Sequence, residues 1–262
     1  MTRIWQLGDL EFVVLWEQLN SDYLPFPFSF MSRTPLYDDF LREKRETAER
    51  VRTRLSGSFD SVLESVAQPD IRIIVDAWDG RDPQRSDGRI RIMATRKGSQ
   101  GFLVTQLPGE TYMHSGGFTV AECDPLRLAD EIVSALPVSK PGDHAEIPLS
   151  PPSEKQDDID YEYGRSRIGA GPEDPVADRS RKFLHIRPTL IGTIDVIQGS
   201  SVFGPRGVTR HRMEWRDLQD SGRYVIGHAA PWKAVAADEK RFIGMINARI
   251  AEVIRVIKEE RR

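Results

Sequence analysis

TVAECDPLRLADEIVSAL at residues 119–136 and KAVAADEKRFIGMINARIAEVI at residues 233–254 follow the same order of events. Each begins with an extended apolar run, continues with an aspartate that can cap a helix, and ends in an amphipathic helical pattern. The two stretches lie in different halves of the chain. They therefore predict two related half-domains that share one sheet or stack face to face.

Strand patterns precede both stretches. In the first half they are IRIIVDAW (71–78), RIRIMAT (89–95), GFLVTQL (101–107) and ETYMHS (110–115), and in the second half RPTLIGTIDVIQG (187–199), GVTRHRMEW (207–215) and GRYVIGH (222–228). Their β-branched and alternating residues are typical of paired strands. The predicted fold class is α/β in the mixed α+β sense, with a pseudo-two-fold arrangement of two β-meander-plus-helix halves around a central sheet.

Helices are predicted before the first meander. The apolar residues of 9–20 cover most of a helix surface, which predicts a core helix. Thr34 and Pro35 suit the start of a helix, and apolar residues recur at helical spacing to Leu55 and again from Phe59 to Val66. Residues 34–67 are therefore expected to form a helical pair against the core helix.

The expected domain organisation is a single domain of residues 1–262, with an N-terminal half at 1–137 and a C-terminal half at 183–262. Between them, residues 138–182 hold many prolines and the acidic run EKQDDIDYE at 154–162. This composition predicts a linker or a mobile loop.

Composition narrows the class of protein. The chain has 262 residues, a net charge of -3 and no large basic block, which disfavours a protein built mainly to neutralise nucleic-acid phosphates. Its single cysteine, Cys123, cannot form an intramolecular disulfide framework, which fits a reducing cytoplasm. Asp9, Glu11 and Glu17 interrupt the N-terminal apolar run, so we expect neither a signal peptide nor a membrane span there.

The common enzyme motifs are missing from the sequence. It has no phosphate loop, dinucleotide glycine fingerprint, HExxH, GxSxG or paired CxxC. Its five histidines stand singly, without the spacing of metal ligands, and Cys123 has no histidine near it in sequence. We expect no cofactor, no metal site and no catalytic residue.

One alternative is a divergent metal-dependent nuclease-like protein that uses the strand around Asp76. An acidic residue on one strand and a lysine on the next, here Lys97, can hold a magnesium ion in such enzymes. However, Thr95 precedes Lys97 by two residues, at the place where that constellation needs a second carboxylate. A solvated strand face explains the pattern better.

A second alternative is nucleic-acid binding through arginines on the hairpins. The residues concerned are Arg89, Arg91, Arg96, Arg206, Arg210, Arg212 and Arg216, with Trp78 and Trp215 near them in sequence. Strand arginines commonly pair with Asp and Glu on neighbouring strands, and no RNP-type motif is present. We therefore expect no nucleic-acid partner.

The order of the elements resembles the EspG family, the ESX secretion-associated proteins of actinobacteria. The resemblance rests on a helix with LWE (15–17), then LPFPF (24–28), IRIIVDAW, a helix ending in SALP (134–137), and the closing hairpin with Gly222, Arg223 and Tyr224. It spans about four-fifths of the chain. Each motif is weak alone, and their order carries the resemblance.

The resemblance implies a cytoplasmic, non-enzymatic chaperone of type VII secretion that binds PE/PPE heterodimers at the apolar tip of the PPE helical bundle. It also implies a pseudo-two-fold fold with flanking helical bundles, and it leaves homodimerisation open. The partner-binding residues it suggests are Asp76, Trp78, Asp79, Gln198, Ser200 and Phe203. The departure from the family is the proline-rich segment 138–182, which stands where a helical segment is usual.

Overall fold

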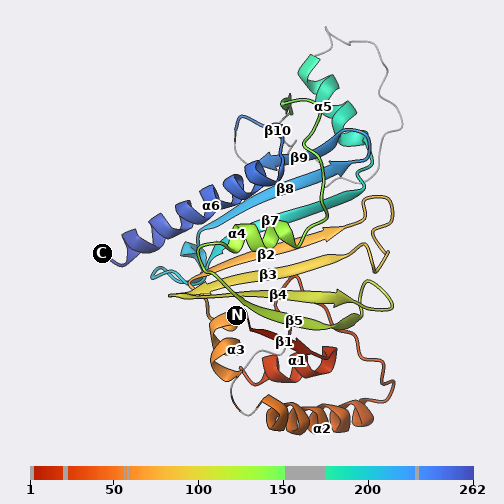
Figure 1. Cartoon of the computed structure of the whole chain (residues 1–262), viewed down its shortest axis with the longest axis vertical. Coiled ribbons are helices and arrows are strands. Elements are labelled where there is room, and N and C mark those ends of the chain that lie inside the picture. The colour runs from red at the N-terminus through yellow and green to blue at the C-terminus, as the bar shows by residue number, and fades with distance from the viewer. Residues whose placement is uncertain (1–2, 20–22, 56, 58, 151–174, 228–229) are drawn as a thin grey trace, which may run out of the picture.

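A computed structural model describes residues 3–19, 23–55, 57, 59–150, 175–227 and 230–262. Its strands form one antiparallel sheet in the order β1-β5-β4-β3-β2-β7-β8-β9-β10-β6 (Figure 1). The strands are β1 (Ile4–Leu7), β2 (Ile71–Trp78), β3 (Ile90–Lys97), β4 (Gln100–Pro108), β5 (Ser115–Cys123), β6 (Glu146–Pro148), β7 (Leu190–Gln198), β8 (Arg210–Leu218), β9 (Gly222–Gly227) and β10 (Lys233–Ala236). The helices are α1 (Asp9–Glu17), α2 (Tyr37–Leu55), α3 (Asp60–Ala67), α4 (Leu128–Ser134), α5 (Pro175–His185) and α6 (Glu239–Glu260), with a short 3-10 helix at Pro205–Gly207.

The register of the two central strands confirms a pseudo-two-fold relation. β2 and β7 pair antiparallel from Ile71 opposite Gln198 to Trp78 opposite Ile191, so a two-fold axis between them places each strand on the other. With the axis normal to the sheet at the Val75–Ile194 pair, each side chain stays on its own side of the sheet. Asp76 then corresponds to Asp195, and their outer partners, Arg91 and Arg212, correspond as well. The two halves therefore share one sheet, which decides between the arrangements that the sequence left open.

The same symmetry reaches the two edges of the sheet. β1 pairs with β5 at one edge and β6 pairs with β10 at the other, so β6 is the counterpart of β1. α5 precedes β7 as α3 precedes β2. Both β6 and part of α5 fall within the predicted linker 138–182, whose boundary at 182 lies inside α5. Residues 151–174 of that linker lie outside the described residues.

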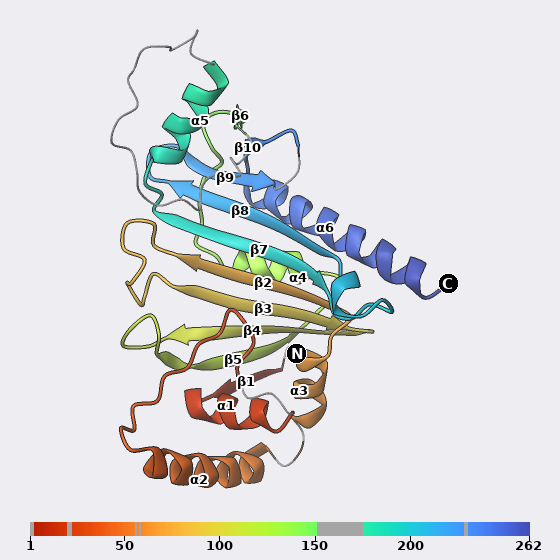
Figure 2. The same ribbon diagram turned by 180° about the vertical axis from the view of Figure 1, so that it is seen from behind.

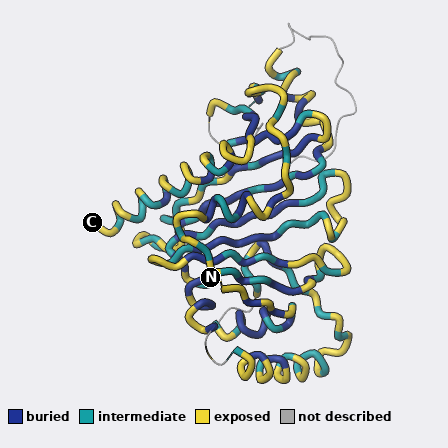
Figure 3. The backbone as a smooth tube through the Cα atoms, in the orientation of Figure 1, coloured by how far each residue is buried: buried dark blue, intermediate teal, exposed yellow. Residues whose placement is uncertain are grey.

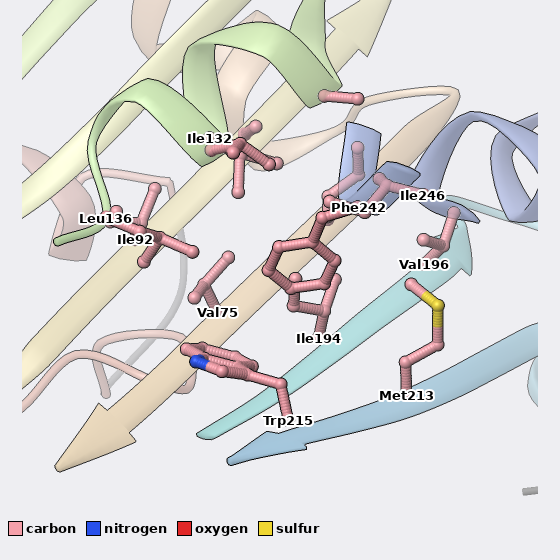
Figure 4. Packing of buried hydrophobic residues seen from close by; sticks show 14 of the residues in the cluster. Val75, Ile92, Ile132, Leu136, Ile194, Val196, Met213, Trp215, Phe242 and Ile246 are labelled. Atoms are coloured by element: carbon pink, nitrogen blue, oxygen red, sulfur yellow. The ribbon is translucent and has the colours of Figure 1, made fainter. Parts of the chain in front are cut away.

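The larger core lies between the sheet and the helices α4 and α6. Phe242 of α6 packs against Trp215 of β8, with ring centroids 5.8 Å apart, and Ile194 of β7 lies beside them (Figure 4). Asp238 caps α6 because its side chain accepts a hydrogen bond of 2.7 Å from the backbone N–H of Arg241, as the sequence pattern predicts. Burial of this apolar face gives the two helices their positions.

On the opposite side of the sheet, helices of the described ranges cover the two ends. α1 is buried on nearly all sides, as predicted, and packs with α3 against β4 and β5, while α2 lies outside them with a largely exposed outer surface (Figure 3). At the other end, Phe183 of α5 meets Tyr224 of β9 at a centroid distance of 5.3 Å. Among the described residues, no helix covers the central strands on this side (Figure 2).

Some boundaries differ from the sequence prediction. α1 ends at Glu17 rather than near 20, and α2 begins at Tyr37 rather than at Pro35. ETYMHS does not form a strand of its own, because only Ser115 joins β5 and the rest forms the turn after β4. β1 was not predicted, because its four residues are too few to show a period.

Candidate functional site

The uncovered side of the central strands is the candidate site, and we call it the open face. Strand residues alternate between the two sides of a sheet, so the register assigns its members. They are Arg89 and Arg91 from the β3 hairpin, Arg72, Ile74, Asp76 and Trp78 on β2, Ile191, Thr193, Asp195 and Ile197 on β7, and Arg210, Arg212, Glu214 and Arg216 on β8. α3, packed on β3 and β4, borders the open face on one side, and α5 borders it on the other (Figure 2).

Asp195 lies at the centre of the open face with no exposed surface, beneath two arginines. Arg210 and Arg212 each donate through Nε and Nη2 to its two carboxylate oxygens, at 2.7 to 2.9 Å. Burial by itself would raise the pKa of Asp195, but the hydrogen bonds from the two guanidinium groups outweigh it and hold that pKa below the usual range. The arginine side chains are 49% and 43% exposed, so positive charge faces the solvent above a buried negative one.

Asp76 makes the corresponding contact on β2 with one arginine. Arg89 approaches its carboxylate at 3.0 Å and lies over the Trp78 ring at 5.2 Å. Burial raises the pKa of Asp76, and Arg89 and Arg91 oppose that rise only in part. These ion pairs confirm that the strand arginines pair with carboxylates across strands. Trp215 and Arg96, grouped with them by sequence, lie on the helix-covered side instead.

The remaining arginines of the open face are held by carbonyl oxygens. Arg72 donates to Ala67 O at 2.9 Å, Arg91 donates to Tyr112 O at 2.8 Å, and Arg216 donates to three carbonyls of the α5 segment. Burial lowers the pKa of all three. Within the described part of the chain, no salt bridge joins any of them to a carboxylate. The open face is therefore net positive.

The loop between β7 and β8 lies at one end of the β2–β7 pair and is tied to the last turn of α6. Glu260 accepts hydrogen bonds from Gln198 Nε2 at 2.9 Å, from Ser201 Oγ at 2.8 Å and from Val202 N at 3.1 Å. Phe203 follows, 78% exposed, on this well-anchored loop. Glu260 had no sequence signal, because its contact depends on the direction of α6.

The structure separates the six predicted partner-binding residues into two groups. Trp78 and Gln198 lie at opposite ends of the β2–β7 pair, about 23 Å apart from the rise of a strand. Asp76, Trp78 and Asp79 belong to one end, and Gln198, Ser200 and Phe203 to the other. The hairpin loops at these ends are related by the pseudo-two-fold axis.

The six residues also differ in exposure. Ser200 and Phe203 are exposed and Trp78 is partly buried. Asp76 and Gln198 are buried at 6% and 2% exposure. Asp79 accepts hydrogen bonds from Arg81 N at 2.8 Å and Arg85 Nη1 at 3.1 Å and so organises its own loop.

A surface hollow of about 640 Å³ lies beside Asp79. Arg85, Lys140, Asp217 and Gln219 contribute to its wall, which mixes the β2–β3 loop with the β8–β9 turn. The hollow is open and its wall mixes charged with apolar side chains, and Arg81 donates a hydrogen bond to Gln219 across it. It brings together the segment after α4 and two hairpin turns, at the end of the sheet where Trp78 lies.

The residues that a metal-dependent or thiol enzyme would use have other roles in this structure. Asp76 is engaged by Arg89, and among the described residues no three His, Cys, Asp or Glu side chains are grouped as metal ligands would be. Cys123 ends β5, and burial raises its thiol pKa to about 12. Lys97 is paired with Glu64 at 2.9 Å. Nothing in this arrangement supports the nuclease alternative.

A helix that crosses a membrane needs about 20 predominantly apolar residues with few or no charges. Of the helices in the described ranges, none combines the required length with an apolar enough sequence.

Comparison with known proteins gives a family and a fold. The EspG family model matches residues 9–244. A solved structure, the Mycobacterium tuberculosis type VII secretion system chaperone EspG5 in complex with a PE25-PPE41 dimer, aligns over 92% of this chain and 93% of that chain, with a TM-score of 0.50 and 11% identity. At that identity the likeness concerns the fold alone, and a search of curated proteins found no match. Because the family model spans most of the sequence and the predicted order of elements agrees, the chain belongs to the EspG family.

Proposed function

We propose that this protein is a cytoplasmic chaperone of type VII secretion that binds a PE/PPE heterodimer and keeps it soluble until export. The observation that carries the proposal is family membership over residues 9–244 together with an uncovered face at the centre of the sheet. The chaperone with the similar fold was solved with a PE25-PPE41 dimer. The client would be a helical heterodimer whose apolar tip would otherwise aggregate.

The dimensions of the open face suit such a client. From β3 to β8 it is about 14 Å wide at the usual spacing of strands, which accommodates one helix of about 10–12 Å diameter. Ile191 and Ile197 lie partly exposed on it, next to the arginines described above. A few apolar anchors within a polar surround favour a reversible complex rather than an obligate one.

We assign the partner-binding residues to two roles. Trp78, Ser200 and Phe203 contact the client directly, since their side chains reach the surface. Asp76, Asp79 and Gln198 act through others: Asp76 holds Arg89 over Trp78, Asp79 shapes the β2–β3 loop, and Gln198 braces the β7–β8 loop. No catalysis is part of this function, because binding alone protects the client.

The test is co-expression of this chain with a PE/PPE-type heterodimer from the same genome. Affinity capture followed by size-exclusion chromatography with light scattering should give one soluble complex of defined stoichiometry. Capture of no such heterodimer, from a set covering the genome's PE/PPE pairs, would contradict the proposal.

A further inference from the structure

The two arginines above Asp195 leave part of their hydrogen-bonding capacity unused. Each guanidinium binds Asp195 through Nε and Nη2, and in the described residues Nη1 of neither makes a hydrogen bond. Both side chains are about half exposed, and one carboxylate between two guanidinium groups leaves one net positive charge. Arg210 and Arg212 are therefore fixed in position and can bind a further acceptor.

Asp195 holds the two arginines in place before a partner binds. A lone surface arginine loses side-chain entropy when it binds a partner, whereas these two are already held by forked hydrogen bonds on a side chain with no exposed surface. Guanidinium groups bind carboxylates well because the planar donors match the two oxygens. The neighbouring Ile197, opposite Arg210 in the register, adds an apolar surface beside the charge.

We propose that Arg210 and Arg212 form a carboxylate-binding site for an aspartate or glutamate that lies next to the apolar tip of the client. The proposal rests on the proposed function and adds the chemistry by which a client is selected. Asp195 is its positioning residue. A client tip with an acidic side chain at that place binds, and one with a basic side chain there is repelled.

The arrangement favours a protein carboxylate over a nucleic-acid backbone. Arg210 and Arg212 are the most exposed arginines of the open face, Ile197 lies beside Arg210 and Glu214 acts on Arg212, and the chain has a net charge of -3. Phosphate binding along a strand of nucleic acid uses extended rows of cations, which would give a steep dependence on salt.

The experiment measures the dissociation constant of the co-expressed client heterodimer between 50 mM and 500 mM NaCl. Arg210→Gln/Arg212→Gln should weaken binding about tenfold or more at low salt and flatten the salt dependence. Arg127→Gln/Arg255→Gln makes the same change in charge at the start of α4 and on α6, on the other side of the sheet, and should bind like the wild type. Because the double variant leaves Asp195 buried without its partners, the triple variant with Asp195→Asn is measured in parallel.

A charge exchange identifies the partner group. Arg212→Glu should abolish binding, and replacing the acidic residue at the client tip by arginine should restore part of it. Wild-type binding with unchanged affinity in the double and triple variants would overturn this inference while leaving the proposed function in place. No binding by the wild type would overturn both. Salt-sensitive binding of a fluorescent single-stranded RNA that the double variant loses, with client affinity unchanged, would also overturn it.

Discussion

Arg223 encloses Asp217 with two parallel hydrogen bonds of 2.7 Å, from Nε and Nη2 to the two carboxylate oxygens. Both side chains are almost fully buried, at 3% and 8% exposure, and the guanidinium also donates to Pro137 O and lies over the Phe242 ring. This pair joins the β8–β9 hairpin to α6 and to the segment after α4. It explains the physical role of arginine in the Gly222-Arg223-Tyr224 motif.

Arg223→Ala should therefore lower the free energy of unfolding by about 3–5 kcal/mol, because it leaves a buried carboxylate without its partner. Urea denaturation at pH 7 measures the loss. Arg255→Ala is the matched control, since Arg255 and Glu259 form an exposed pair and removing it should change stability by less than about 0.5 kcal/mol. Equal effects of the two substitutions would contradict the assignment.

Gly192→Ala tests the packing of the central strands. A β-carbon at Gly192 would meet the Trp215 ring and would lie 2.6 Å from the β-carbon of Ala77, so the core must shift. We expect a loss of about 1–3 kcal/mol in the free energy of unfolding. Gly244→Ala on α6 meets nothing within 4 Å and should instead stabilise by about 0.5–1 kcal/mol. Thermal unfolding of both variants measures these changes. An unchanged stability of Gly192→Ala would show that the core tolerates the added volume.

The sequence predicted the strands and helices with the clearest periods, and it failed where local pattern carries no information. IRIIVDAW and the helix after Asp238 matched because alternation and capping are local properties. The pairing of β2 with β7 joins segments that are distant in the sequence, so local pattern could not predict it. The separation of Trp78 from Gln198 follows from the same pairing. The sequence indicated a group of arginines on the hairpins. Only the strand pairing in the structure shows that Arg210 and Arg212 share Asp195.

Phe203→Ser should weaken client binding about tenfold or more without changing thermal stability, because the side chain is 78% exposed and has little packing to lose. Leu126→Ser, at a residue 72% exposed in the turn before α4, is the control and should bind normally. Calorimetric titration with the heterodimer measures both. A wild-type affinity for Phe203→Ser would remove this residue from the interface.

Glu260→Gln should loosen the β7–β8 loop. Its carboxylate holds Ser201 Oγ and Val202 N, and the substitution weakens these charge-assisted hydrogen bonds. Hydrogen exchange at the Val202 amide should become about threefold to tenfold faster, while Glu259→Gln should leave it unchanged. Burial tends to raise the pKa of Glu260, but the hydrogen bonds lower it overall, so the loop should stay closed above pH 4.5 and loosen as the pH falls through the lowered pKa. A Val202 exchange rate that is the same in both variants would rule out this role for Glu260.

Asp195 and Asp76 should respond to neutralisation in opposite ways. The pKa of Asp195 is lowered in the fold, so its contribution to stability is complete above the ordinary value of 3.8 and is lost as the pH falls through the lowered pKa. Asp195→Asn should therefore cost about 1–3 kcal/mol at pH 7, a value reduced by the solvent exposure of its arginines, and much less near pH 3.

The pKa of Asp76 is raised, so its charged form is disfavoured in the folded state above that pKa. Asp76→Asn should then cost less than about 1 kcal/mol at pH 7 or stabilise the protein. Urea denaturation at pH 3, 5 and 7 measures both variants, and a loss for Asp195→Asn that does not shrink at pH 3 would show that the arginine contacts contribute through packing rather than charge.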